Sequence, residues 1–316
     1  MENKLTVSLS PHIHSGMDVD RIMWNVVLAL MPALAVAVWT FGLPALWVVL
    51  LAVGSCLATE WIIDRWVFRV PQTLTNGSAV ITGLLLGFNL PSILPWWMVI
   101  IGGIVAIGIG KMSFGGLGCN IWNPALVGRV FLLLSFPAAM TTWPTGVGSG
   151  IDGVTGATFL TTLNEGGAEA LREANLMDMA VGHMNGSLGE VGSIALLIGF
   201  GWIWLKGIVS WHIPVATLGG AALLSWLLGG NPLLDLLSGG LMLGALFMAT
   251  DFVTSPMTRP GQLLFGFLIG IITIIIRRFG SYPEGVSFAI LLMNSFVPLI
   301  NRYMRPRVFG ERRGRK

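Results

Sequence analysis

The sequence predicts an all-α polytopic membrane protein of about ten transmembrane helices, arranged as two five-helix inverted repeats. Hydrophobic residues make up 54% of the 316 residues and charged residues only 10%, and the mean hydropathy is +0.79. Soluble domains carry about 25% charged residues, so this chain is far too apolar to be one. Apolar runs near the length that a helix needs to cross a bilayer recur along the chain. They form two equal sets on either side of one polar stretch, residues 141–190.

The apolar runs divide into long and short ones. The six long runs cover residues 22–42, 45–64, 95–110, 191–209, 211–229 and 261–277. The four runs that are shorter or broken by glycine and proline cover residues 77–91, 122–140, 236–253 and 285–302. Each half contains five spans, an odd number, so the second half begins on the opposite side of the membrane from the first. A duplicated half is therefore inserted upside down, as an inverted repeat. Short runs at corresponding places in two halves point to a central site, although close helix packing through small residues explains each one equally well.

The distribution of lysine and arginine predicts the orientation. If the N-terminus is inside, fourteen of the eighteen basic residues fall on the cytoplasmic side, which is the side that positive charge favours. The acidic 141–190 loop then lies on the outer face. We interpret the basic tail as a topology anchor at lipid headgroups rather than as a nucleic-acid site. The chain then divides into five predicted segments. They are a cytoplasmic N-terminal segment (1–21), a first membrane repeat (22–140), the outer loop (141–190), a second membrane repeat (191–302) and a cytoplasmic tail (303–316).

Within the polar stretch, the sequence DGVTGATFLT runs from Asp152 to Thr161. It presents one hydroxyl, on Thr158, directly after Gly156 and Ala157, which are too small to shield it. A modifying enzyme can reach such a hydroxyl, and a flat ligand can then lie against the same backbone. The alternative is a glycine-rich loop without special chemistry, because a motif match is a hypothesis until its context agrees.

This segment resembles the flavinylation motif of ion-pumping membrane oxidoreductases. That motif is an aspartate, two free positions, Ser/Thr-Gly-Ala-Thr, one free position, an apolar residue and then Thr or Ser. All seven constrained positions match, which chance produces in a chain of this length less often than roughly once in a thousand. The matching residues are Asp152, Thr155, Gly156, Ala157, Thr158, Leu160 and Thr161. The resemblance implies that a flavin transferase joins FMN through its phosphate to Thr158.

Polar residues at membrane depth are secondary candidates for flavin binding. The Asn-Pro pair at Asn123 begins a helix whose first backbone N–H groups point at whatever precedes it, which suits a carbonyl, a phosphate or the edge of a reduced flavin ring. Asn120 lies in the same glycine-rich entry. Arg129 is costly in hydrocarbon unless it faces protein, water or an anion. Arg129 could therefore have either of two roles: it binds a ligand, or it makes a structural contact to the carboxyl ends of helices.

No pattern predicts a metal centre or a catalytic group. Cys56 and Cys119 lie far apart in apolar or glycine-rich surroundings, so we expect two packed small residues and no disulfide. Glu60 and Asp251 are the carboxylates nearest to membrane depth, and they are either oxygen ligands on a cation path or interfacial residues. The chain lacks both usual glycine-rich nucleotide loops, so pyridine nucleotide chemistry belongs to a partner. The polar first 20 residues predict no cleavable signal peptide.

A wider resemblance covers nearly the whole chain. It is carried by GKMSFGGLGCNIWNPALVGRVFLLLSFP, by the motif around Thr158 and by RRFGSYPEGVSFAILLMNSFVPLI. Together these stretches resemble the D subunits of the Rnf electron-transport complexes. The related B subunits of the sodium-pumping NADH:quinone reductase are typically longer, with an N-terminal extension. Thr155 stands where many members have serine. The resemblance implies covalent FMN on the outer face, and it leaves open a second, noncovalent flavin such as riboflavin nearer the cytoplasm.

The implied function is electron relay within a complex of the bacterial inner membrane. Electrons pass through FMN between an outer-face FMN subunit and a cytoplasmic-side subunit, coupled to Na⁺ or H⁺ transport, with the ferredoxin/NAD couple at the level of the whole complex. The chain by itself is not catalytic on a soluble substrate. Its expected partners are the other Rnf subunits, the flavin transferase and the lipid bilayer, and nucleic acid is not among them. Two alternatives stay open: an inverted-repeat solute channel or transporter, and a structural anchor for other subunits.

Overall fold

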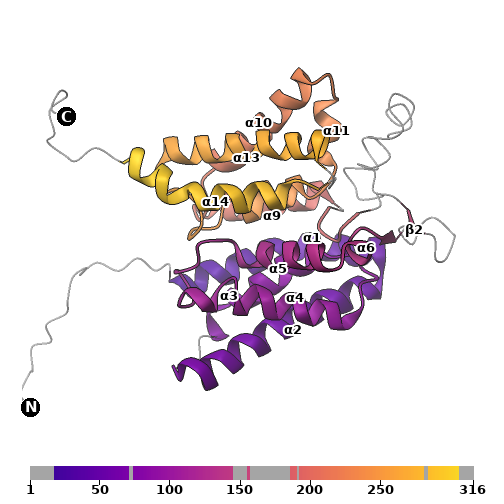
Figure 1. Ribbon diagram of the computed structural model, residues 1–316, viewed down its shortest axis with the longest axis vertical. Coiled ribbons are helices and arrows are strands. Elements are labelled where there is room, and N and C mark those ends of the chain that lie inside the picture. The colour runs from indigo at the N-terminus through magenta and orange to yellow at the C-terminus, as the bar shows by residue number, and fades with distance from the viewer. Residues whose placement is uncertain are drawn as a thin grey trace, which may run out of the picture.

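The computed structural model describes residues 18–70, 74–144, 155–156, 186–190, 192–280 and 284–305. Within them the regular secondary structure is helical, apart from one pair of two-residue strands. The start of α1 (Val19–Phe41) and the end of α14 (Val286–Tyr303) lie at one end of the molecule, on the left of Figure 1. The end of α6 (Pro137–Met140) and the strand β2 (Thr155–Gly156) lie at the other end. We term these the tail end and the loop end.

Each predicted apolar run contains a helix, so the prediction of helical segments is confirmed. The first half of the chain forms α1, α2 (Leu43–Ile62) with its π-helical extension η1 (Ile63–Phe68), η2 (Leu74–Asn76), α3 (Ser78–Phe88), α4 (Trp96–Gly108), η3 (Met112–Phe114), α5 (Pro124–Ser135) and α6 (Pro137–Met140). The second half forms α9 (Ser193–Leu205), α10 (His212–Leu227), α11 (Pro232–Leu237), α12 (Leu241–Leu243), the π-helical turn η5 (Gly244–Met248), α13 (Arg259–Phe279) and α14. The strands are β1 (Trp143–Pro144) and β2 (Thr155–Gly156).

Among the residues that the structure describes, five helices are long and apolar enough to cross a membrane, judged by length and composition. They are α1, α2 with η1, α4 through η3, α13 and α14. The shorter apolar helices α3, α5, α9 and α10 accompany them. The 11 residues of α3 rise by about 16 Å, roughly half of a bilayer's hydrocarbon core. The third and eighth runs are short, as predicted.

Proline and asparagine set several helix boundaries. The predicted run 122–140 is two helices, because Pro137 cannot continue the hydrogen bonding of α5 and Phe136 adopts φ −133° and ψ 57° ahead of it. The Oδ1 atom of Asn123 accepts a hydrogen bond from the backbone N–H of Ala125 at 3.1 Å. The prediction that an Asn-Pro pair begins this helix is therefore confirmed.

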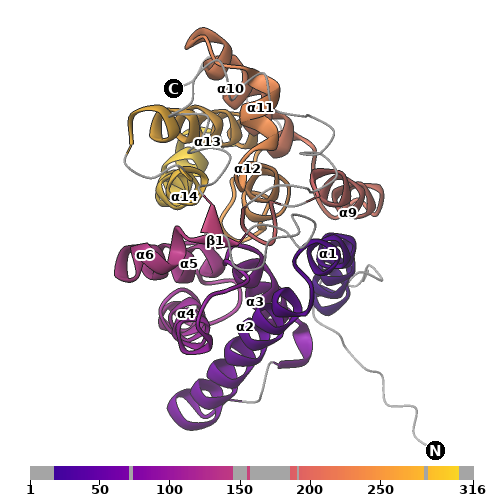
Figure 2. The same ribbon diagram turned by 90° about the vertical axis from the view of Figure 1, so that its right-hand side faces the viewer.

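The two halves have corresponding helix contacts. In the first, α2 packs on α3 and α4, and α4 packs on α5; in the second, α10 packs on α11 and α13, and α13 packs on α14. The halves meet where α1 contacts α9 and where α5 contacts α14, as the view onto the loop end shows (Figure 2). Small residues permit the closest packing: a Cβ atom added at Gly83 would lie 2.5 Å from Val53 Cα.

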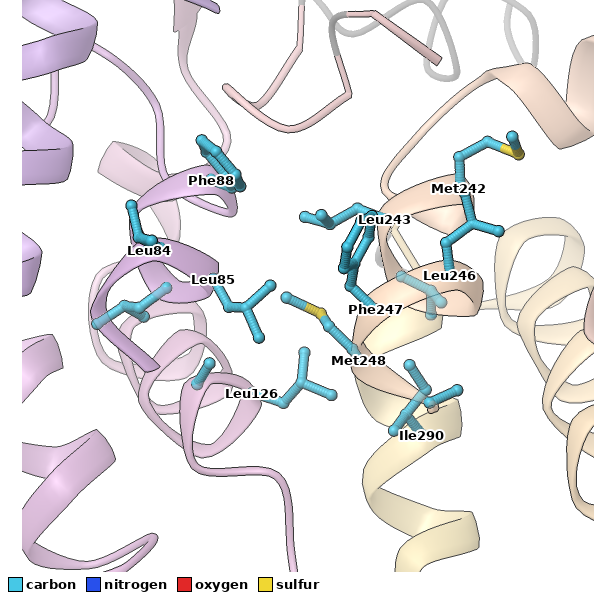
Figure 3. Packing of buried hydrophobic residues seen from close by; sticks show 14 of the residues in the cluster. Leu84, Leu85, Phe88, Leu126, Met242, Leu243, Leu246, Phe247, Met248 and Ile290 are labelled. Carbon is cyan, nitrogen blue, oxygen red and sulfur yellow. The ribbon is translucent and has the colours of Figure 1, made fainter. Parts of the chain in front are cut away.

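The centre of the molecule is a layer of apolar side chains between the two interrupted segments. Leu85 and Phe88 of α3 face Phe247 and Met248 of η5, together with Leu243 of α12 (Figure 3). All five are buried. This layer separates the polar groups at the tail end from those at the loop end.

Candidate functional site

Two residues of the predicted attachment motif, Thr155 and Gly156, are held at the loop end. In β2, Thr155 pairs with Pro144 and Gly156 pairs with Trp143 in an antiparallel arrangement. Trp143 is buried, and Figure 2 shows β1 between α5 and α14, where the two halves meet. The remaining motif residues lie outside the residues that the structure describes: Asp152, Ala157, Thr158, Leu160 and Thr161.

A cavity opens at the tail end. It is bounded by the start of α1, by α3, by the entry to α5 and by the end of η5. Leu85 and Phe247 contribute apolar wall, whereas Lys111, Asn120 and Asn123 contribute polar groups. The structure thus brings two of the secondary candidates, Asn120 and Asn123, to one cavity.

Backbone contacts orient both asparagines. The Nδ2 atom of Asn123 donates to the carbonyl oxygen of Met248 at 3.2 Å, which ties the start of α5 to the end of η5. The Nδ2 atom of Asn120 donates to the carbonyl oxygen of Trp122 at 3.1 Å. Fixed amide groups on an apolar wall suit the recognition of a flat ligand with polar edges.

Lys111 is the buried cation of this cavity. Its Nζ atom lies 2.7 Å from Glu60 Oε2 and 2.7 Å from Ser78 Oγ, which joins the end of α4 to α2 and to the start of α3. Glu60, considered for a cation path, is therefore an ion-pair partner. Asp251, the other such carboxylate, lines the cavity and accepts a hydrogen bond from Thr254 at 3.0 Å. Lys111 had no predicted role at a site, although a lysine directly after an apolar run was visible in the sequence.

Arg129 lies away from the two asparagines, near the loop end. Its Nη1 atom donates to Asn89 Oδ1 and to Ser287 Oγ, both at 2.7 Å, and its Nη2 atom forms an ion pair with Glu284. These contacts join α5 to the end of α3 and to the beginning of α14. Sequence reasoning missed Glu284, which lies in the resemblance stretch but was given no role.

A second arginine at the loop end contacts a helix carboxyl end. Arg277, in the last turn of α13, donates to the backbone oxygens of Asp235 at 2.5 Å and Ser238 at 2.8 Å. Arg278 pairs with the Asp235 carboxylate at 3.1 Å. The contact to helix carboxyl ends that was considered for Arg129 is thus made by Arg277, at the end of α11.

The two cysteines differ in environment. Both are free, as predicted, and Cys56 is buried. The expectation that Cys119 is packed is wrong, because it is exposed in a turn whose glycines at 115, 116 and 118 all have positive φ. Such a turn extends away from the helices, and nothing packs within 4 Å of the Cβ position at Gly116 or Gly118. Among the described residues, no group of three His, Cys, Asp or Glu side chains is placed to hold a metal ion.

Comparison with known proteins identifies the family. Residues 6–310 match the model of the NQR2, RnfD, RnfE family. The chain belongs to this family. It is 46% identical over 309 residues to the D subunit of a Na⁺-translocating ferredoxin:NAD⁺ oxidoreductase complex from Acetobacterium woodii, covering 98% of this chain and 96% of the relative. It is 44% identical over 325 residues to the D subunit of a proton-translocating ferredoxin:NAD⁺ oxidoreductase complex from Clostridium ljungdahlii, covering 99% and 98%.

A third relative, the D subunit of an ion-translocating oxidoreductase complex from Stutzerimonas stutzeri, is 41% identical over 327 residues, covering 93% of this chain and 92% of the relative. The predicted resemblance to the Rnf D subunits is therefore confirmed. Family membership and the apolar helices together make the chain a multi-pass membrane protein whose relatives are subunits of ion-translocating oxidoreductase complexes.

Proposed function

We propose that this chain is the membrane-embedded D subunit of an ion-translocating ferredoxin:NAD oxidoreductase complex and relays electrons through FMN linked covalently to Thr158. The DGVTGATFLT motif carries the proposal, and family membership supports it. FMN, when bound, supplies the redox chemistry that protein side chains lack. The chain places the flavin between an outer-face FMN subunit and a cytoplasmic-side subunit. The relatives named above belong to a proton-translocating and a Na⁺-translocating complex, so we propose that the transported ion is either H⁺ or Na⁺.

The pairing of β1 with β2 supports this placement of the flavin. Gly156 is tied to Trp143, which is buried at the loop end. Thr158 follows two residues later, so covalent geometry alone keeps its Cα atom within about 7 Å of that of Gly156. This pairing supports the proposal that the flavin is attached at the loop end.

The cavity at the tail end fits a second, noncovalent flavin such as riboflavin. Leu85 and Phe247 offer apolar surface to the faces of a flat ring system. The amides of Asn120 and Asn123 offer polar contacts to the carbonyl and N–H groups of its edge, and Lys111 supplies a nearby positive charge. Two flavins at opposite ends would let electrons cross the apolar layer between α3 and η5.

Equivalent contacts at opposite ends support the proposed ten-span inverted repeat. Lys111, just after α4, binds Ser78 at the start of α3. Arg277, at the end of α13, binds Ser238 shortly before α12. In each half, a cation at the end of the fourth helix thus holds the start of the interrupted third segment. One contact lies at the tail end and the other at the loop end, as an in-plane two-fold axis requires.

The proposed orientation places the tail end in the cytoplasm and the loop end on the outer face of the bacterial inner membrane. Fourteen of the eighteen basic residues are then cytoplasmic, in agreement with the positive-inside rule. Both termini are cytoplasmic in this arrangement. A flavin transferase and an outer-face flavoprotein would reach the attachment loop from the same side.

In-gel flavin fluorescence tests the proposal. The full chain is co-expressed with its flavin transferase, purified and run on a denaturing gel, as wild type, Thr158→Ala and Thr162→Ala. Thr162 is the matched control because it lies in the same loop outside the constrained motif positions. We expect fluorescent bands in the wild type and in Thr162→Ala, and none in Thr158→Ala.

Two results would contradict the proposal. A wild type without fluorescence, with the transferase shown to be active on another target, would favour the solute channel or transporter. Undiminished electron transfer by a complex assembled with Thr158→Ala would favour a structural anchor, because a relay cannot function without its flavin.

A further inference from the structure

Besides the Asp235–Arg278 ion pair, four buried charged side chains gather at the loop end, and the electron relay as described uses none of them. They are Arg129 on α5, Arg277 on α13, Glu284 just before α14 and Glu190 just before α9, and each is 2% to 7% exposed. Arg129 and Arg277 both act electrostatically on Glu190. With both carboxyl groups ionised, two positive charges balance two negative ones. Water can stabilise an additional charge only weakly in this buried region, so neighbouring charged side chains must neutralise it.

The turn that carries Glu190 is docked firmly against the interrupted helices. The backbone N–H of Gly189 donates to the carbonyl oxygen of Phe88 at 2.7 Å, and that of Leu188 donates to Leu90 at 3.4 Å. A Cβ atom at position 189 would lie 2.7 Å from Leu243 Cδ2 and 2.9 Å from Phe88 Cβ. The turn therefore sits between the end of α3 and α12, and Glu190 has a defined position there.

Glu190 differs from the other buried carboxyl groups at this end. Within the part of the chain that the structure describes, Glu284 pairs with Arg129 and Asp235 pairs with Arg278, but Glu190 makes no ion pair within 4.0 Å. Its Oε1 atom accepts a hydrogen bond from Ser187 Oγ at 2.9 Å. A buried carboxyl without an adjacent cation is the group that most readily binds a proton.

The surroundings of Glu190 act on its protonation in opposite directions. Burial raises the pKa of the Glu190 carboxyl, whereas the charge of Arg129, the hydrogen bond from Ser187 and the charge of Arg277 lower it. The segments packed directly against this turn, α3 and α12, contribute the uncharged Phe88, Leu90 and Leu243. Burial is the largest of these influences, so the Glu190 carboxyl binds a proton more readily than an exposed glutamate does.

Unpartnered polar atoms near this turn indicate a route for protons. The Nε atom of Arg129, the Oε1 atom of Glu284 and the hydroxyls of Ser193 and Ser238 are buried and have no hydrogen-bond partner among the residues that the structure describes. Buried polar atoms are nearly always satisfied, and internal water is the usual partner where protein groups are lacking. Bound water beside Glu190 would pass protons between the carboxyl and the loop-end surface.

We propose that Glu190 is a proton-binding site that takes up a proton when an electron enters the flavin-carrying loop and releases it when the electron leaves. This inference rests on the proposed function. One electron from the donor flavoprotein adds one negative charge at the loop end. One proton from the adjacent aqueous phase forms an O–H bond with the Glu190 carboxylate and adds one positive charge. The total charge of the loop end is then unchanged.

The first test needs no flavin. The midpoint temperature of unfolding of the full chain in detergent is measured against pH for wild type, Glu190→Gln and Glu190→Asp. A carboxyl whose pKa is raised binds more protons folded than unfolded, so its stabilising contribution is complete below the ordinary pKa of about 4.3 and is lost as pH rises through the raised value. We expect this fall in the wild type and in Glu190→Asp, but not in Glu190→Gln. Identical pH profiles for wild type and Glu190→Gln would overturn the proposal.

The second test follows protonation during reduction. Infrared difference spectra of the flavin-loaded full chain, reduced electrochemically minus oxidised, are recorded in H₂O and D₂O. We expect a protonated carboxyl band that shifts in D₂O, disappears in Glu190→Gln and persists, displaced, in Glu190→Asp. The control Asp235→Asn removes an ion-paired carboxyl at the same end and keeps the band. A band that is unaltered in Glu190→Gln would overturn the link between electron and proton.

The two proposals fail in different ways. In-gel fluorescence shows first whether the wild type carries the flavin. A wild type without fluorescence overturns the proposed function and the proposed coupling of proton uptake to flavin reduction. A pH profile that depends on Glu190 still supports the proton site in that case. A fluorescent wild type whose pH profile of unfolding equals that of Glu190→Gln overturns the proton site and leaves the proposed electron relay unaffected.

Discussion

Arg129 of α5 and Glu284, the residue two positions before α14, form a buried ion pair that joins the two halves of the protein at the loop end. The same guanidinium donates hydrogen bonds to Asn89 and Ser287, so one side chain contacts three segments. The contact between α5 and α14 therefore depends on charge as well as on apolar packing, and this dependence can be measured.

We expect Arg129→Ala to destabilise the protein by about 3–5 kcal/mol, because it leaves the Glu284 carboxylate buried without a partner. Glu284→Gln should cost less, since a neutral amide still accepts a hydrogen bond from Arg129. Denaturant unfolding of the two single variants and of the double variant gives their coupling energy. Additive effects would show that the pair makes no net contribution.

Helix α3 needs glycine at position 83. Gly83→Ala should destabilise the protein by about 1–3 kcal/mol, because the new methyl group would overlap the backbone of Val53 on α2. Gly219→Ala on α10 is the matched control: nothing lies within 4 Å of its Cβ position, and alanine favours a helix by about 0.5–1 kcal/mol. Thermal unfolding of both variants should therefore show shifts of opposite sign. A neutral Gly83→Ala would mean that α2 and α3 are not closely packed.

If the proposed noncovalent flavin binds in the cavity at the tail end, a substitution there should weaken its binding without affecting the covalent flavin. Asn120→Ala should weaken its binding about tenfold, the effect of losing one net hydrogen bond of ~1 kcal/mol or slightly more. Asn231→Ala removes an exposed asparagine at the start of α11, outside the cavity, and should leave binding unchanged. Flavin released by acid precipitation is measured for each variant, while in-gel fluorescence confirms that the covalent flavin stays. Equal release from both variants would place the second flavin elsewhere.

The exposed Cys119 gives a direct test of orientation. A membrane-impermeant maleimide should label it in inside-out vesicles but not in spheroplasts, because the tail end faces the cytoplasm in the proposed arrangement. Cys56 is buried and should react only after denaturation, and Cys119→Ser supplies the blank. Labelling of Cys119 in spheroplasts would invert the proposed topology.

Much of the fold follows from the sequence because membrane segments are governed by local rules. Hydrophobic length identified the helical runs, and Asn123 with Pro124 predicted the start of α5 from capping chemistry. Pro137 divides the same run into α5 and α6, because proline lacks the backbone N–H that a continuous helix needs; the sequence already showed this run to be interrupted. The exposure of Cys119 was not predictable from composition, because it depends on the path of a glycine turn.

For the site, the attachment motif, the family resemblance and the two asparagines of the cavity could all be predicted from the amino-acid sequence. Only the tertiary structure paired Lys111 with Glu60 and Arg129 with Glu284, and only it left Glu190 buried without an ion-pair partner among the residues described. The physical reason is distance along the chain. Motifs and helix caps act over a few neighbouring residues, whereas the partner of a buried charge is chosen by which helices pack together.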